Sequence, residues 1–184
     1  MIGALLLVFS VSLNVLLARR VQSLRVQSEN RLAPLLTVGT LVPPITAERI
    51  DGKNETLTYS SSPAPTVLYI FTPPCTWCAR NMDNFKTLVE KGSGRYRFIG
   101  LSLEDQGLAG YVKKYDLTLP VYARLSPQTK ETYKLSGTPQ TIVISSDGRV
   151  LQNWMGAYIG DRKSQIEAFF HVALPGIREP QKYP

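Results

Sequence analysis

The chain has 184 residues, which is enough for one ordinary domain and an extension. Its formal net charge is +7, but the basic residues form no stripe with interleaved aromatic side chains, which argues against a nucleic-acid-binding surface. The only two cysteines are Cys75 and Cys78, so the sequence excludes a framework of several structural disulfides.

The first predicted element is an apolar segment at residues 2–18, which contains no charged side chain. Its length is near the lower limit for a transmembrane helix. Residues 16–18 form a poor signal-peptidase site, so an uncleaved anchor is favoured over a cleaved signal peptide. Arg19 and Arg20 follow this segment, and the positive-inside rule taken alone would keep the rest of the chain in the cytoplasm. Residues 1–18 are therefore predicted to be a transmembrane signal-anchor, and residues 19–33 a juxtamembrane spacer.

The folded domain is predicted at residues 34–175, with a polar tail at 176–184. Its first elements are a hairpin around Asp51-Gly52, a buried strand at Thr66–Phe71 and a helix that begins at Cys75 and ends near Gly92. The later predicted elements are a strand at 96–101, helices at 107–116 and 126–135, a hairpin of 140–144 with 150–154, and a helix at 161–172. This order predicts an α/β fold with a central mixed sheet and helices on both faces.

The segment Cys75-Thr76-Trp77-Cys78 is the most informative part of the sequence. It lies between a buried strand and the first turn of a helix, where the helix N-terminus stabilises a thiolate at Cys75. The alternative is half of a zinc site, but there is no second cysteine pair, and His171 alone cannot complete four ligands. A second motif, Gly137-Thr138-Pro139, precedes another predicted strand. Together the two motifs predict a thiol–disulfide oxidoreductase with no metal site.

This order of motifs resembles the thioredoxin superfamily. More narrowly, it resembles the membrane-anchored redoxin branch that includes TlpA, ResA and the cytochrome c maturation thioredoxins. The resemblance covers residues 34–174 and is carried by Phe71–Cys78, by the strand end Leu101–Asp105, and by Gly137–Pro139 with Asp147-Gly148. It implies a thioredoxin-like fold in which residues 98–121 supply an extra helix–strand unit.

The resemblance also implies roles for individual residues. Cys75 would be the exposed, attacking thiolate, and Cys78 the shielded cysteine that acts second. Pro139 would be cis and lie against the disulfide, leaving the Thr138 backbone to pair with an extended substrate; an ordinary trans loop proline is the alternative. Trp77 would form an apolar docking surface, or would only pack on the rim.

Three positions depart from the family pattern. Pro74 stands where thioredoxins usually have a tryptophan. The buried strand acid of thioredoxin falls on Tyr69, and the glutamate of ResA-like proteins falls on Asn81, so the usual proton acceptors for the buried cysteine are missing. Glu104 or Asp105, at the end of the next predicted strand, is the expected substitute.

The function implied by the resemblance is an anchored enzyme whose redox-active Cys75–Cys78 disulfide needs no other cofactor. Its partners would be protein thiols and disulfides on the extracytoplasmic (periplasmic) side, with an upstream electron donor, and reduction is favoured over oxidation. Two alternatives are a peroxiredoxin-type thiol peroxidase and a Sco-like copper chaperone. The peroxidase signature is only half present, because Thr72 fits but its proline falls on Leu68, and the copper chaperones space their cysteines one residue further apart.

Overall fold

The computed structural model describes residues 13–21 and 35–177. The chain divides at Leu35 into two units, each described by itself. In the first unit, residues 13–21 are helical and exposed. Among the helices of the described residues, none combines the length and the apolar character needed to cross a membrane. Most of the predicted anchor and spacer, and residues 178–184 of the predicted tail, lie outside the described residues, so those assignments stay predictions.

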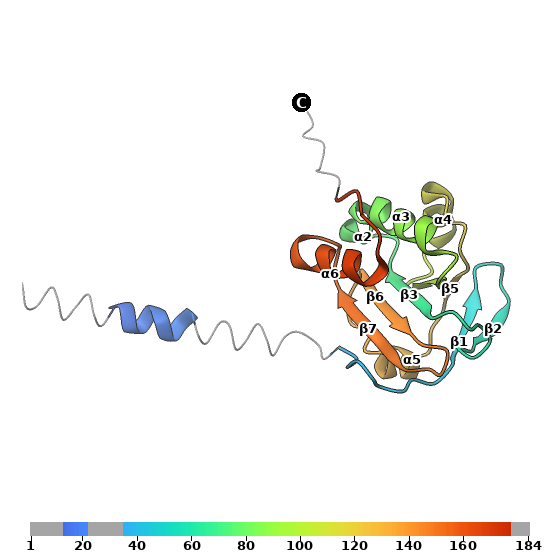
Figure 1. The fold of residues 1–184 in the computed structure, drawn as a ribbon, viewed down its shortest axis with the longest axis horizontal. Coiled ribbons are helices and arrows are strands. Elements are labelled where there is room, and N and C mark those ends of the chain that lie inside the picture. Colours follow the sequence, from blue (N-terminus) through green and yellow to red (C-terminus); the bar gives the residue numbers. More distant parts are fainter. Residues whose placement is uncertain (1–12, 22–34, 178–184) are drawn as a thin grey trace, which may run out of the picture. The chain divides into compact units, whose positions relative to one another are not determined.

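The second unit is built on a seven-stranded mixed sheet with the strand order β2-β1-β5-β4-β3-β6-β7 (Figure 1). Strand β4 pairs in parallel with β3 and β5, whereas the other neighbours are antiparallel. The predicted α/β class with a mixed sheet is therefore confirmed. The strands are β1 (Ile45–Arg49), β2 (Asn54–Leu57), β3 (Thr66–Phe71), β4 (Arg97–Ser102), β5 (Val121–Ala123), β6 (Gln140–Ile144) and β7 (Val150–Met155).

Helices cover both faces of the sheet, as the sequence predicted (Figure 1). Within this unit, helix α5 (Pro127–Thr132) lies on one face of the sheet, and the other helices of the unit lie on the opposite face (Figure 1). In this unit the helices are α2 (Thr76–Arg80), α3 (Met82–Gly92), α4 (Leu108–Tyr115), α5 (Pro127–Thr132) and α6 (Gly160–Phe170). Helix α6 ends earlier than predicted because His171 adopts a left-handed conformation, with φ at 54°.

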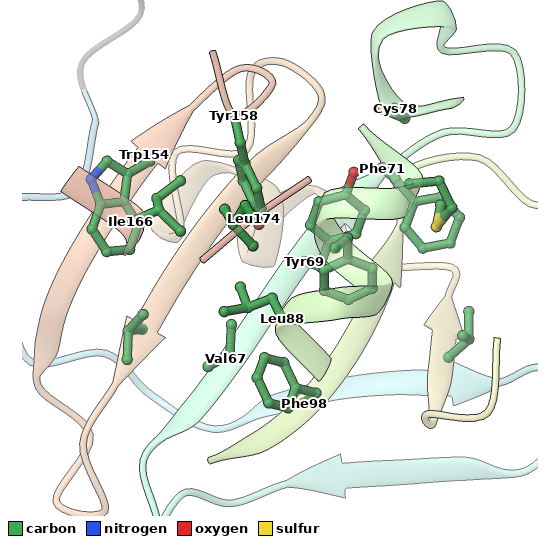
Figure 2. Packing of buried hydrophobic residues seen from close by; sticks show 14 of the residues in the cluster. Val67, Tyr69, Phe71, Cys78, Leu88, Phe98, Trp154, Tyr158, Ile166 and Leu174 are labelled. Atoms are coloured by element: carbon green, nitrogen blue, oxygen red, sulfur yellow. The ribbon is translucent and has the colours of Figure 1, made fainter. Parts of the chain in front are cut away.

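Strand β3 is buried along its whole length and supplies both halves of the core. Because alternate residues of a strand point to opposite faces, Val67, Tyr69 and Phe71 belong to one cluster, and Leu68 and Ile70 to the other. The first cluster also contains Cys78, so the redox motif is part of this layer of the core (Figure 2). The apolar run in the sequence is thus explained by a central strand that is covered on both faces.

The prediction of one continuous helix from Cys75 is wrong, because the chain breaks at Asn81 between α2 and α3. The Asn81 side chain is fully buried, and its Oδ1 accepts hydrogen bonds from the Tyr158 N–H at 2.9 Å and from Asn84 Nδ2 at 3.1 Å. A buried amide needs such partners. One of them lies 77 residues further along the chain, so a local sequence pattern does not reveal it.

Candidate active site

The two cysteines are joined in a disulfide at the N-terminus of α2, with their Cα atoms 5.2 Å apart. Cys75 is the N-cap residue, and its Sγ accepts a hydrogen bond from the Cys78 N–H at 3.0 Å. The same N–H would stabilise a Cys75 thiolate after reduction. Cys75 is half-buried, whereas Cys78 has no exposed surface. The Cys75 sulfur is therefore the one that another molecule can reach, which fits the predicted order of attack.

The second motif lies beside the first. The Thr138–Pro139 peptide bond is cis, which confirms the prediction, and Pro139 is buried directly before β6. The residue after it, Gln140, pairs with Ile70 near the end of β3 that leads to the motif. A small pocket of about 180 Å³ brings the two motifs together; it is lined by Trp77, Thr138, Pro139, Gly156, Ala157, Ile159 and Arg162.

Trp77 forms one wall of this pocket, which we call the proline pocket, and remains 47% exposed. The Arg80 guanidinium lies 4.5 Å from the centre of its ring, a cation–π distance. Ile159, on the same pocket, is 44% exposed. An apolar surface is thus open to solvent next to the disulfide, although the docking role of Trp77 stays a prediction.

A buried polar network lies within the core on the Cys78 side of the sheet. It joins Tyr69 to Asn81 Nδ2 at 3.5 Å, Asn81 to Tyr158, and the Tyr158 hydroxyl to the Thr141 hydroxyl at 2.7 Å. Burial raises the pKa of Tyr69 and of Tyr158 far above the ordinary tyrosine value. The network is therefore uncharged at neutral pH and offers no carboxylate to accept a proton from Cys78.

The predicted substitute acceptors, Glu104 and Asp105, follow β4 at exposed positions. The end of β4 does approach the motif, since the Leu103 N–H donates to the Phe71 carbonyl at 3.0 Å. The Asp105 carboxylate, however, accepts a hydrogen bond from Arg124 Nε at 3.1 Å, and this bond lowers the pKa of Asp105. A proton-accepting role for either acid stays a prediction.

A second groove, of about 400 Å³, lies on another side of Cys75 and was not foreseen from the sequence. Its far wall is α4, which presents Tyr111, Lys114 and Tyr115. Their i, i+3, i+4 spacing places them on one helical face, but it does not show that this face lies across the groove from Cys75. The Tyr111 hydroxyl is buried and has no hydrogen-bond partner among the described residues. The residues that line the groove are Pro73, Pro74, Cys75, Thr76, Ala79, Gly107, Gly110, Tyr111, Lys114 and Tyr115.

The described part of the chain contains no group of three His, Cys, Asp or Glu side chains that could hold a metal ion. His171, the only histidine of the sequence, is exposed at the C-terminal end of α6.

Solved structures similar to this chain share its fold. The thioredoxin domain of a thiol-disulfide oxidoreductase from Bacteroides vulgatus superposes with a TM-score of 0.59 at 17% identity, covering 73% of this chain and 99% of that one. StoA from Bacillus subtilis gives 0.55 at 16% identity, covering 70% and 99%. A thiol:disulfide interchange protein from a Bacteroides species gives 0.57 at 17% identity, covering 75% and 93%.

No protein-family model matches the sequence, and no curated protein matches it either. The structural likeness therefore establishes the fold, which is thioredoxin-like. The chain carries the Cys75–Cys78 disulfide and a cis proline, and Trp77 of the disulfide segment lines one pocket with Pro139.

Proposed function

We propose that this chain is a thiol–disulfide oxidoreductase that acts on cysteines of other proteins. The observation that carries the proposal is the disulfide between half-buried Cys75 and fully buried Cys78, in a segment whose Trp77 lines one pocket with cis Pro139. Two of the similar structures named above support it, because one is a thiol-disulfide oxidoreductase and the other a thiol:disulfide interchange protein.

The reductive reaction has two steps. In the dithiol form, the Cys75 thiolate attacks one sulfur of a substrate disulfide; a Cys75–substrate disulfide forms, and the other substrate sulfur leaves as a thiolate. The Cys78 thiolate then attacks the Cys75 sulfur, which releases the second substrate thiolate and restores the Cys75–Cys78 disulfide. Two electrons pass from the enzyme to the substrate, and an external dithiol must return them for the next cycle.

Cys78 must lose its proton before the second step. The buried network of Tyr69, Asn81, Tyr158 and Thr141 contains no carboxylate that could accept this proton. We assign this role to Glu104 or Asp105, which follow β4, the strand that pairs with β3 before the motif. Replacing both with the amides should slow release from a mixed disulfide without slowing its formation, which stopped-flow kinetics with a fluorescent substrate would separate.

The proposal extends to location and direction. The apolar segment at residues 2–18 supports anchoring in a membrane, and the resemblance to the cytochrome c maturation branch supports an extracytoplasmic domain that works as a reductant. A reporter that is active only outside the cytoplasm, fused after Pro184, tests the topology. Activity only of a cytoplasmic reporter would contradict it.

The reduction potential of the full chain, equilibrated against glutathione, tests the activity and its direction. A value near about −270 mV supports a reductant, and a value near about −120 mV supports an oxidant. The variant Cys78→Ser should accumulate the mixed disulfide with a substrate, whereas Cys75→Ser should form none. If the wild-type chain shows no reversible disulfide, the proposed exchange mechanism is wrong.

A further inference from the structure

The proline pocket combines an apolar wall with a fixed positive charge. Arg162, in the first turn of α6, lines the pocket and donates from Nη1 to the Ala157 carbonyl at 2.9 Å. This bond uses part of the guanidinium, which has five N–H donors, and the remaining donors are available to a ligand. No ion pair holds Arg162 within the described part of the chain.

The backbone around Arg162 makes room for the guanidinium. Gly156 has φ at 98°, a conformation that side-chain-bearing residues rarely adopt, and a Cβ there would lie 3.0 Å from Arg162 Nη1. The Gly156 N–H donates to the Pro139 carbonyl at 2.6 Å, so the same residue joins the cis proline to the arginine. The charge is thus held at the wall of a pocket, and is not on a freely moving surface side chain.

Among the described residues that line the pocket, Arg162 is the only ionisable one. Asp161 precedes Arg162 in the chain, but it is exposed and does not line the pocket. Arg80 does not line the pocket; its guanidinium lies 4.5 Å from the centre of the Trp77 ring. The space of about 180 Å³ suits one side chain.

We propose that Arg162 makes the proline pocket a receptor for a carboxylate, so that the preferred partner is a protein segment with an aspartate or glutamate close to its reactive cysteine. The apolar part of that side chain would pack on Trp77 and Ile159, and its carboxylate would accept hydrogen bonds from Arg162. This inference rests on the proposed function, because it names the substrate class for the same site.

The test compares two series of disulfide-linked peptides, reduced by the purified full chain in its dithiol form. One series carries a single glutamate at each position from three before to three after the cysteine, and the other carries glutamine there. At low salt, the wild-type chain should reduce the glutamate peptide about fivefold faster at one or two of these positions. The difference should shrink at high salt because the charges are then screened.

Variants connect the preference to one side chain. In Arg162→Gln the ratio of the rates for the glutamate and glutamine peptides should fall to about one, and Arg162→Lys should keep part of the preference. The matched control is Arg149→Gln, which also removes one positive charge but lies in the β6–β7 hairpin, where the arginine pairs with Asp147.

The inference and the proposed function fail in different ways. If no peptide disulfide is reduced at all, the proposed function is wrong. Equal rates for glutamate and glutamine peptides in the wild type, or a preference that survives in Arg162→Gln, would overturn the inference alone. So would an equal slowing of both series in Arg162→Gln, since the arginine would then support the loop instead of binding the carboxylate. If the chain reduced glutathione disulfide faster than its methyl esters but showed no preference for glutamate peptides over glutamine peptides, that result would contradict a protein partner.

Discussion

Replacing Asn81 with alanine should destabilise the folded state strongly, because this side chain joins the redox helix to the loop before α6. Its Oδ1 is the acceptor for the Tyr158 N–H at 2.9 Å and for Asn84 Nδ2 at 3.1 Å, and all three residues have no exposed surface. In the variant the Tyr158 N–H is left buried without a partner, which costs about 1–3 kcal/mol. Asn84 loses its hydrogen bond to Asn81, and this loss adds about 1 kcal/mol to the cost. It keeps only a long contact of 3.5 Å to the Tyr158 carbonyl.

The expected loss in free energy of unfolding is therefore about 2–4 kcal/mol, equivalent to a fall in Tm of roughly 6–12 °C. Thermal and urea unfolding of the oxidised protein, followed by circular dichroism, measure both quantities. The control is Asn54→Ala, which removes an exposed asparagine of β2 and should change stability by less than about 0.5 kcal/mol. A loss below about 0.5 kcal/mol in Asn81→Ala, as small as in the control, would mean that another group or a water molecule satisfies the Tyr158 N–H. The argument from buried donors would then be refuted.

Three further substitutions test other parts of the structure. Tyr111→Phe removes a buried hydroxyl that lacks a partner among the described residues, so the free energy of unfolding should rise by about 1 kcal/mol; a fall would show that the hydroxyl is bonded. Glu167 accepts the Leu174 N–H at 2.8 Å, and this bond lowers its pKa below the ordinary 4.5. The contribution of the ionised Glu167 to the free energy of unfolding is therefore present above pH 4.5 and is lost as the pH falls through the folded pKa. Glu167→Gln should be less stable than the wild type at pH 7 but equally stable in acid. A stability difference that does not depend on pH would contradict this. Gly156→Ala should cost about 1 kcal/mol or more, because φ is 98° and the new Cβ would meet Arg162, and it should also reduce the preference for acidic peptides; wild-type stability would contradict the argument from φ.

The sequence alone predicted most of the fold and the identity of the redox pair, since these depend on local patterns. The continuous apolar run of β3 predicted a strand covered on both faces, and the Cys-x-x-Cys segment after it predicted the start of a helix. The cis state of Pro139 followed from the resemblance, because the Gly-Thr-Pro motif before a strand matches a known pattern. The three-residue strand β5 is too short for periodicity to reveal.

What the sequence could not give is the surroundings of the cysteines, because they come from segments distant along the chain. Asn81 looks like an ordinary helix residue until Tyr158 is seen to donate to it across 77 positions. Arg162 looks like a solvated arginine of a helix until the turn at Gly156 places it at the pocket beside Pro139. Local propensity and periodicity determined the elements and the reactive pair, whereas the close approach of loops, which depends on long-range packing and buried hydrogen bonds, decided which groups surround that pair.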